Sequence, residues 1–322
     1  MNRVNVLYQF DDKYAPYAGI SMTSLLENCK GVIGVFIYCA AMGLSEDNKA
    51  RIDRIGERYG AQIVWLDTTK AVEYINSCKT GEWNGSKATW MKIFLIQDLP
   101  EDVDTILYLD SDTIVCGDIS EILNVDITNN PIACAYDSVA FANARTIGTP
   151  VYYNAGVTYY NVKMWKEPGF FEAMLEHLYK NVENYPDNDQ RLLNDYFRGQ
   201  IKVLPMKFNF QGLHMLYNNE QYFAAYSNDV YYSPEEIDEA RANPVVHHFF
   251  RILGDYPWEE GNWHPAKEEY NFWKSKTEWA NMADLSKERS FVFKVERLLF
   301  KLMPKKSFLK LYKKICDVKV YS

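Results

Sequence analysis

The stretch ILYLDSDTIV, residues 106–115, decides the fold of this chain. Four apolar residues lead into two aspartates, Asp110 and Asp112, and an apolar pair follows. A short apolar run bounded by polar residues predicts a buried strand, which we expect over residues 105–110. In open α/β sheets, ligands bind beyond the carboxyl ends of the strands. Both aspartates would lie at such an end.

Asp110 and Asp112 are two residues apart, so their side chains point to the same side of an extended chain. Two converging carboxylates repel each other unless a cation lies between them. Their hard oxygen atoms are ligands that Mg²⁺ or Mn²⁺ prefers, and such ions commonly bridge to phosphate. A chance Asp-x-Asp in a solvated turn is the alternative for the motif alone, but the buried strand before it favours a metal site.

Strand and helix patterns alternate around this stretch. Strands that alternate with helices form a parallel sheet covered on both faces, so we predict an α/β fold. We expect residues 137–150 to form an excursion and an aromatic-rich loop region to precede the last strand. The predicted strands cover residues 4–10, 32–39, 62–66, 105–110, 131–136, 152–162 (interrupted at 154–156), 201–204 and 244–250. The predicted helices cover residues 17–28, 45–59, 88–97, 167–181 and 187–197, and a loop is predicted at 81–86.

Charge is distributed unevenly along the chain. The net charge is −8, but residues 291–322 hold nine basic and two acidic residues, which leaves the rest at −15. An acidic body argues against nucleic acid binding. The six cysteines are scattered without close pairs, which favours reduced thiols in a cytoplasm. We expect no secretory segment at the start of the chain, because Asp11, Asp12 and Lys13 would interrupt its apolar run early.

The basic tail has the pattern of two amphipathic helices divided at Pro304. Apolar residues form one stripe of the first helix, and Lys and Arg lie opposite; the stripe contains Phe291, Val295, Leu298, Leu299 and Leu302. Such a helix can lie in a membrane interface and contact anionic lipid. A solvated basic face on a helix docked to the body is the alternative. We therefore predict a domain of residues 1–265 and a helical extension of residues 266–322, which would attach a cytoplasmic protein to the inner face of the plasma membrane.

Polar groups recur at other predicted strand or helix ends. They are Asp11-Asp12, Asn154-Ala155-Gly156, Asn188-Asp189-Gln190 and His247-His248. Each has a simpler interpretation as a turn, a tight bend, a helix cap or a hydrogen-bonded core histidine. Their joint occurrence at one sheet edge favours a binding site.

Taken together, the motifs resemble glycosyltransferase family 8. This is a family of retaining enzymes that includes bacterial lipopolysaccharide galactosyl- and glucosyltransferases and glycogenin. The resemblance runs from about residue 4 to residue 258, and its strongest pieces are LYLDSDTIVCGDI (107–119), YYNAGVTYYNVKMW (152–165) and DNDQRLLNDYFRGQIKVLPMKFN (187–209). It implies a GT-A fold, a Rossmann-like mixed, mainly parallel sheet flanked by helices, with the basic helical tail appended.

The resemblance implies a metal-dependent transfer of galactose or glucose from UDP-galactose or UDP-glucose to a saccharide or lipid-linked acceptor, with an α linkage. Asp110 and Asp112 would chelate Mn²⁺ (or Mg²⁺) bridging the two phosphates. His248 would be the third ligand because it takes the family's histidine–aromatic position, although His247 is one residue away. The remaining residues implied to bind the nucleotide are Asp11, Asp12, Lys92, Ser111 and Gly254.

The resemblance also implies a donor-sugar pocket and a mechanism. Gln190 would lie under the reacting carbon, and because an amide is a poor nucleophile we favour front-face attack over a covalent adduct. Asp189 would stabilise the positive charge that develops on the sugar. An adduct on Asp189 or Gln190 stays open as the alternative. The residues implied to line the sugar are Lys92, Asn154, Ala155, Gly156, Asp189 and Gln190.

One segment departs from the family's pattern. The chain has Tyr256 where the family has a lysine that contacts the diphosphate, and the distance from His248 to Trp258 is longer by two residues. Arg251 could replace the missing charge from this longer loop.

Two other functions fit part of the sequence. Asp110 and Asp112 also match the phosphatase motif of the haloacid dehalogenases, in which the first aspartate is the nucleophile. That family generally places the motif on its first core strand, whereas three predicted strands precede it here. A sugar-nucleotide-binding protein without catalytic activity is the third possibility.

Overall fold

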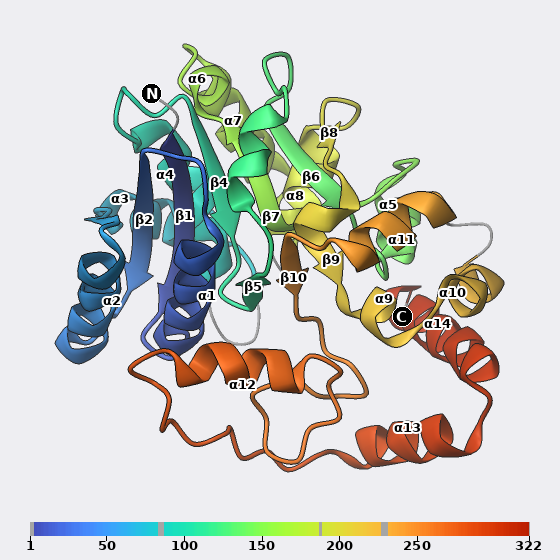
Figure 1. Ribbon diagram of the computed structural model, residues 1–322. Helices are drawn as coiled ribbons and strands as arrows, with labels where there is room; N and C mark the ends of the chain where they lie inside the picture. The colour runs from blue at the N-terminus through green and yellow to red at the C-terminus, as the bar shows by residue number, and fades with distance from the viewer. Residues whose placement is uncertain (1–2, 83–86, 187–188, 227–230, 322) are drawn as a thin grey trace.

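The computed structural model describes residues 3–82, 87–186, 189–226 and 231–321 (Figure 1). A seven-stranded sheet with the order β3-β2-β1-β4-β7-β6-β8 forms its centre. β7 is antiparallel to both neighbours, and the other neighbouring pairs are parallel. The predicted mainly parallel sheet is therefore confirmed. The strands are β1 (Arg3–Asp11), β2 (Gly34–Met42), β3 (Gln62–Trp65), β4 (Thr105–Leu109), β6 (Ile132–Tyr136), β7 (Tyr153–Asn161) and β8 (Lys202–Val203).

Both faces of the sheet are covered, because successive side chains of a strand point to opposite faces. In β1, Val6 and Tyr8 belong to one apolar core and Leu7 to the other. The first core includes residues of α1 (Ala15–Asn28), α2 (Glu46–Tyr59), α5 (Phe141–Ile147), α9 (Gly212–Leu216), α10 (Asn219–Tyr226), α11 (Pro234–Ala242) and α14 (Lys305–Tyr321). The second includes residues of α3 (Thr69–Ser77), α4 (Met91–Leu95), α6 (Val162–Trp165), α7 (Phe170–Asn181) and α8 (Asp189–Tyr196).

A second, three-stranded sheet has the order β5-β10-β9. It consists of β5 (Thr113–Val115), β10 (Val246–His248) and β9 (Phe210–Gln211). β5 begins directly after Asp112, so only the Asp110–Asp112 turn separates it from β4 in the large sheet. β10 pairs antiparallel with β5, with His248 opposite Thr113. This register carries the distant histidine pair to the Asp-Ser-Asp turn.

Local sequence signals explain the boundaries of α2. Ser45 is its N-cap, and the Ser45 hydroxyl accepts a hydrogen bond of 3.3 Å from the backbone N–H of Asn48. Gly60 ends the helix in the left-handed region, with φ of 67°. Both predictions are confirmed.

Several predicted boundaries are wrong. Residues 154–156 lie within β7, and the Gly156 carbonyl continues the ladder with β4 by accepting a 2.8 Å hydrogen bond from the Asp110 N–H. The predicted interruption survives only as a register shift in the pairing of β7 with β6, between Tyr153 and Thr158. Residues 137–150 contain α5, and the aromatic-rich region contains α9 to α11, whose short length hides their periodicity. The helix expected over 167–181 begins at Phe170, after Gly169. Residues 83–86 of the predicted loop and 187–188 of the predicted helix start lie outside the described residues.

The helix expected over residues 88–97 is three consecutive short pieces, the 3₁₀ helices η1 and η2 on either side of α4. The described 3₁₀ helices are η1 (Ala88–Trp90), η2 (Ile96–Asp98), η3 (Ile119–Asn124), η4 (Val182–Asn184) and η5 (Met206–Asn209).

The C-terminal segment contains α12 (Lys267–Ser275), α13 (Phe291–Leu302) and α14, so the two tail helices divided at Pro304 are confirmed (Figure 1). Phe308 and Leu309 of α14 are buried in the first core. α13 is attached by buried Asp255, which pairs with Arg289 and Arg297. Among the described helices, none has the length and apolar composition needed to cross a membrane.

Candidate active site

Asp110, Asp112 and His248 lie together at the carboxyl end of β4. One ligand atom of each lies within 4.8 Å of the others. Nε2 of His248 is 3.3 Å from Oδ1 of Asp112 and 3.8 Å from Oδ2 of Asp110. His247 points elsewhere, since its Nδ1 lies 2.7 Å from Oε2 of Glu269. The geometry therefore groups His248, and not His247, with the two aspartates.

Asn209 orients His248. The Asn209 side-chain NH₂ group donates a 2.8 Å hydrogen bond to Oδ1 of Asn154. The other terminal atom of the Asn209 side chain is therefore its oxygen, Oδ1. That oxygen accepts a 3.1 Å hydrogen bond from Nδ1 of His248. Because Nδ1 carries the hydrogen, Nε2 of the neutral imidazole directs its lone pair at the aspartates. Metal-binding histidines commonly have such a second partner.

Gly156 leaves the space that this cluster occupies. A Cβ atom at Gly156 would lie 2.2 Å from Cε1 of His248 and 2.6 Å from Oδ2 of Asp110. Both distances are far below van der Waals contact, so any larger residue would displace the histidine or the carboxylate. The glycine of the Asn-Ala-Gly motif thus allows His248 and Asp110 to lie close to the backbone of β7. Its own backbone conformation there is not an unusual one.

The charges of the cluster match a cation. Burial raises the pKa of Asp110, and Asp112 raises it further, while Lys92 and His248 lower it. Burial lowers the pKa of His248, but Asp112 and Asp110 outweigh burial and the net pKa is raised. A divalent cation would replace the proton that these groups otherwise share. Two carboxylates and one imidazole fit a hard or borderline divalent ion.

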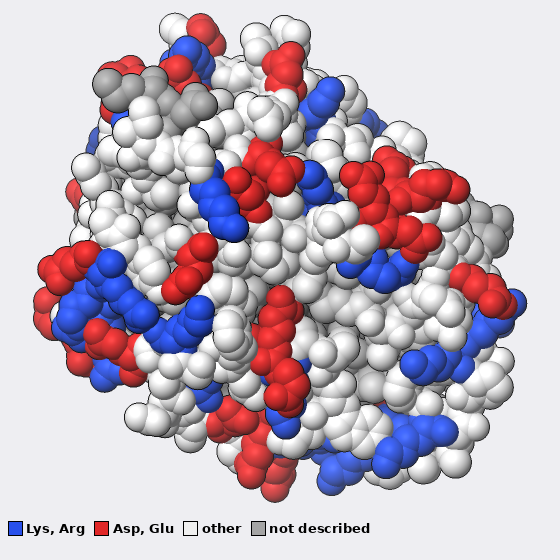
Figure 2. All heavy atoms as spheres, viewed as in Figure 1, with Lys and Arg blue, Asp and Glu red and all other residues white. Residues whose placement is uncertain are grey.

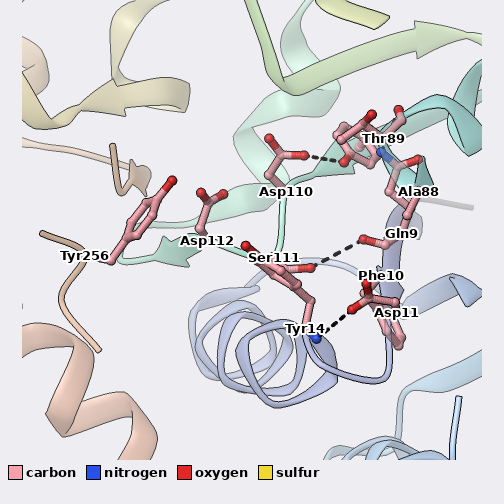
Figure 3. A pocket seen from close by; sticks show the side chains of 11 residues that line it. Gln9, Phe10, Asp11, Tyr14, Ala88, Thr89, Asp110, Ser111, Asp112 and Tyr256 are labelled. Atoms are coloured by element: carbon pink, nitrogen blue, oxygen red, sulfur yellow. Dashed lines mark hydrogen bonds between the residues drawn. The ribbon is translucent and has the colours of Figure 1, made fainter. Parts of the chain in front are cut away.

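Two adjoining cavities share the aspartates. The smaller has a volume of about 110 Å³ and the larger about 760 Å³. Asp110, Asp112 and Tyr256 border both. Figure 3 shows the smaller cavity, whose other lining residues include Gln9, Phe10, Asp11, Tyr14, Thr89 and Ser111. The larger cavity is lined, among others, by Asp137, Tyr152, Asn154, Gln190, Arg191, His248, Arg251 and Tyr312.

Gln190 is fixed in the wall of the larger cavity. Its Oε1 accepts hydrogen bonds from the Ala155 N–H at 2.9 Å and from the Asn154 amide at 3.2 Å. Its Nε2 donates to Oδ2 of Asp137 at 3.2 Å, and the same oxygen accepts from Asn154 at 3.1 Å. The predicted residues Asn154, Ala155 and Gln190 therefore form one network, which Asp137 completes.

Lys92 and Asp189 are brought together behind this wall. Nζ of Lys92 lies 2.9 Å from Oδ2 of Asp189, and both side chains are buried. The same ammonium group lies 4.0 Å from the centroid of the Tyr108 ring. The Tyr108 hydroxyl donates to Oδ1 of Asp110, so the buried pair adjoins the metal cluster.

Besides Lys92, two predicted nucleotide-binding residues, Asp12 and Gly254, lie outside the described lining of both cavities. Asp12 accepts hydrogen bonds from the backbone N–H of Ser45 at 2.8 Å and the Asn48 amide at 2.9 Å. A 2.6 Å hydrogen bond from the Ser45 hydroxyl is the main cause of the lowered pKa of Asp12, and the other two bonds lower it further. All three bonds connect Asp12 to the start of α2. Gly254 has φ of 80° and packs against Phe293 of α13. Asp11 and Ser111, by contrast, line the smaller cavity.

Sequence reasoning missed Asp137, Asn209 and Tyr108. Asp137 directly follows β6, so the rule that drew attention to other strand ends could have found it. Tyr108 lies two residues before Asp110 on the same face of β4, which also could have been noticed. Asn209 lies in η5 with no local signal, and only the packing of distant segments reveals it.

The sequence model for "Glycosyl transferase family 8" matches residues 5–261. The chain belongs to this family. The expected enzyme class, a glycosyltransferase, is thereby confirmed, and the match decides against a haloacid-dehalogenase phosphatase.

Curated relatives agree with the family. A putative glycosyltransferase of Haemophilus influenzae is 29% identical over 64% of this chain and 63% of its own length. A lipopolysaccharide 1,2-glucosyltransferase of Escherichia coli K12 is 27% identical over 64% of the chain and 62% of its own length. A lipopolysaccharide 1,3-galactosyltransferase of Salmonella typhimurium is 24% identical over 88% of the chain and 82% of its own length. The match thus spans less than two thirds of the first two relatives.

The structure of the galactosyltransferase LgtC, solved with donor and acceptor sugar analogs, has a similar fold. It is 22% identical, with a TM-score of 0.67 over 85% of this chain and 96% of its own. This likeness confirms the expected GT-A fold.

Proposed function

We propose that the chain transfers galactose or glucose from a UDP-sugar to a saccharide or lipid-linked glycan acceptor, retaining the α configuration and requiring Mn²⁺ (or Mg²⁺). The observation that carries the proposal is the position of Asp110 and Asp112, which border both cavities. A diphosphate held there would direct its nucleoside into one cavity and its sugar into the other. The names of the lipopolysaccharide glucosyl- and galactosyltransferase relatives support the hexose.

The cavities suit the two ends of such a donor. The smaller one combines apolar and aromatic walls with the carboxylate of Asp11, which can accept from a base or a ribose hydroxyl. The larger one lies within the usual volume range of about 300–1,000 Å³ for small-molecule sites, with space for a hexose and an acceptor. Its network of Asn154, Asp137 and Gln190 presents amides and carboxylates, which are suitable partners for sugar hydroxyls.

We propose Asp110, Asp112 and His248 as the metal ligands. A divalent cation bound to them supplies charge neutralisation for the departing diphosphate. Arg251 is our candidate for the positive charge that the family's lysine supplies and that Tyr256 does not. Its guanidinium carbon lies 5.1 Å from the centroid of the Tyr256 ring, and both residues border the larger cavity. A stacked guanidinium at that position can contact a phosphate oxygen.

The surroundings of Gln190 support front-face attack. Its carbonyl oxygen already accepts two hydrogen bonds, which further reduces the low nucleophilicity of an amide. Asp189 is paired with Lys92 and lies outside the described lining of both cavities, which disfavours it as a covalent nucleophile. We propose that Gln190 contacts the sugar and that Asp189 and Lys92 position the wall behind it.

We further propose that α13 attaches the protein to an anionic membrane surface on the cytoplasmic side. Phe291 is 80% exposed and Leu302 is 73% exposed, and Leu298 lies between them at helical spacing. Lys294 and Lys301 are exposed on the same helix. Figure 2 shows basic side chains gathered at the lower right of the molecule, where Figure 1 has α13 and α14. Leu299, expected in the same stripe, instead packs against the first core. An interfacial helix combines these two kinds of side chain.

The test is a panel of nucleotide sugars, each with and without Mn²⁺, scored for thermal shift and for slow release of the nucleoside diphosphate. We expect a UDP-hexose to raise the melting temperature and to be hydrolysed only with the metal present. The anomeric configuration of a transfer product, read by NMR, tests retention. If no UDP-sugar produced a shift or turnover, the proposal would be wrong. Binding without any turnover would favour the non-catalytic alternative.

A further inference from the structure

A second group of metal-ligand side chains lies on the opposite face of β10. It consists of Cys116, His247 and Glu269, and one potential ligand atom of each lies within 4.8 Å of the others. None of the three lines the described walls of the two cavities. The adjacent histidines of β10 therefore serve two different clusters, because neighbouring residues of a strand point to opposite faces.

Two paired strands and a helix position the three side chains of this group. Cys116 follows β5, and its backbone N–H donates a 2.9 Å hydrogen bond to the carbonyl of Val245, next to β10. Since Cys116 lies opposite Val245, it shares a face of the ladder with His247, two residues further on. Glu269 reaches the same face from the first turn of α12. Three separate segments thus converge on one point.

The ligand types differ from those of the aspartate cluster. A thiol, an imidazole and a carboxylate suit Zn²⁺, whereas oxygen-rich sites suit Mg²⁺ and Mn²⁺. We propose that Cys116, His247 and Glu269 form a second metal site that binds Zn²⁺ with three protein ligands and one water. The site is independent of the proposed donor-site metal and of the proposed transfer reaction.

The distances permit this with small movements. Zn²⁺ bonds of about 2.0–2.3 Å place tetrahedral ligand atoms roughly 3.5 Å apart. Nδ1 of His247 is now 2.7 Å from Oε2 and 2.9 Å from Oε1 of Glu269, so the pair must separate slightly. The Cys116 thiol donates to the carbonyl oxygen of Pro244 at 3.4 Å and would lose its proton on binding.

Solvent can reach the group. The side chain of His247 is 17% exposed and that of Glu269 is 26% exposed. This exposure provides a route for the ion and space for a water as fourth ligand. Zn²⁺ there would join α12 to the small sheet that carries His248, so metal occupancy would stabilise the attachment of α12.

Cobalt substitution tests the proposal, because Co²⁺ bound to a thiolate absorbs in the near ultraviolet. The full chain is reduced, stripped with a chelator and titrated with Co²⁺. We expect one equivalent to produce the thiolate band, Zn²⁺ to remove it, and excess Mn²⁺ to leave it unchanged. Zn²⁺ should also raise the melting temperature by several degrees.

Matched variants assign the ligands. Cys116→Ser should abolish the band, and Glu269→Gln should weaken Co²⁺ binding at least tenfold. Cys29→Ser, which changes a partly buried cysteine elsewhere, and Asp110→Asn, which changes only the aspartate cluster, should both retain it. Circular dichroism of each variant checks folding. Absence of the band in the wild-type chain, or an equal band in Cys116→Ser, would overturn the proposal.

Discussion

Nζ of Lys92 lies 2.9 Å from Oδ2 of Asp189, and both side chains are almost completely buried. Burial raises the pKa of Asp189, and Lys92 partly counteracts that effect. Because Lys92 also lies over the ring of Tyr108, which hydrogen-bonds Asp110, the pair connects the start of α8 to the metal cluster. The sequence motifs named both residues as separate contacts of the donor, but the fold makes them partners.

Lys92→Met should leave the Asp189 carboxylate buried without its partner. Breaking a buried pair in this way costs about 3–5 kcal/mol of unfolding free energy. The pKa of Asp189 would rise further, so the protonated carboxyl would be the stable form in the folded state. The loss of unfolding free energy should therefore be largest near neutral pH and should shrink as the pH falls through the raised pKa of Asp189. Urea unfolding across pH measures this.

Lys163→Met is the control for that variant, since Lys163 forms an exposed pair with Asp104. Exposed pairs contribute about 0–1 kcal/mol, so its effect should be small at every pH. Equal losses in the two variants would contradict the importance assigned to the buried pair.

Asp110→Asn should remove metal-dependent turnover of the UDP-sugar by at least about a hundredfold, because a ligand charge is lost at the centre of the cluster. Turnover against Mn²⁺ concentration is the measurement. Asp104→Asn changes an aspartate at the other end of β4 and should behave like the wild type. Full activity in Asp110→Asn would refute the metal assignment.

Gly156→Ala should disturb the cluster sterically. The new Cβ would lie 2.2 Å from Cε1 of His248, so we expect weaker Mn²⁺ binding and a loss of about 1–3 kcal/mol of stability from overpacking. Gly34→Ala is the matched control, since its Cβ would meet its nearest neighbour at an ordinary 3.5 Å. Isothermal titration with Mn²⁺ and thermal melting compare the two. Unchanged metal affinity in Gly156→Ala would count against His248 as a ligand.

Asn209→Leu should leave Nδ1 of His248 without its hydrogen-bond acceptor. Removing such an outer partner typically weakens metal binding 10–100-fold. The expected readout is a higher Mn²⁺ concentration at half-maximal activity. Asn130→Leu is the control: Asn130 precedes β6, and its replacement should not change the Mn²⁺ concentration at half-maximal activity. If both variants bound Mn²⁺ like the wild type, Asn209 would have no positioning role.

The triple variant Phe291→Ser, Leu298→Ser and Leu302→Ser should bind anionic vesicles at least tenfold more weakly, because burial of each large apolar side chain contributes about 1.5–3 kcal/mol. Deleting the whole tail is a poorer test, because it would also remove Leu309, which is fully buried in the first core, and so would disturb folding. Vesicle sedimentation at low and high salt is the measurement. Ile33→Ser is the control, because it removes a similarly exposed apolar residue elsewhere and should leave vesicle binding unchanged. Undiminished binding by the triple variant would exclude α13 as the contact.

The order of strands and helices around Asp110 could be predicted because it rests on local patterns. Apolar alternation, the Ser45 cap and the Gly60 stop each act within a few residues. The prediction failed at residues 154–156, where the polar and small residues have low strand propensity. There the pairing on either side decides, because Val157 is paired with Leu109 of β4 and Tyr153 with Tyr136 of β6.

The sequence by itself determined the α/β class, the strand that ends in Asp110-Ser111-Asp112, and the amphipathic tail. Only the tertiary structure decided which histidine faces the aspartates, because a shift of one residue in the register of β10 would exchange His247 and His248. It also decided that Lys92 pairs with Asp189 and that Asn209 holds His248. Periodicity and caps are encoded locally, whereas convergence of side chains from distant elements depends on how the sheets and helices pack.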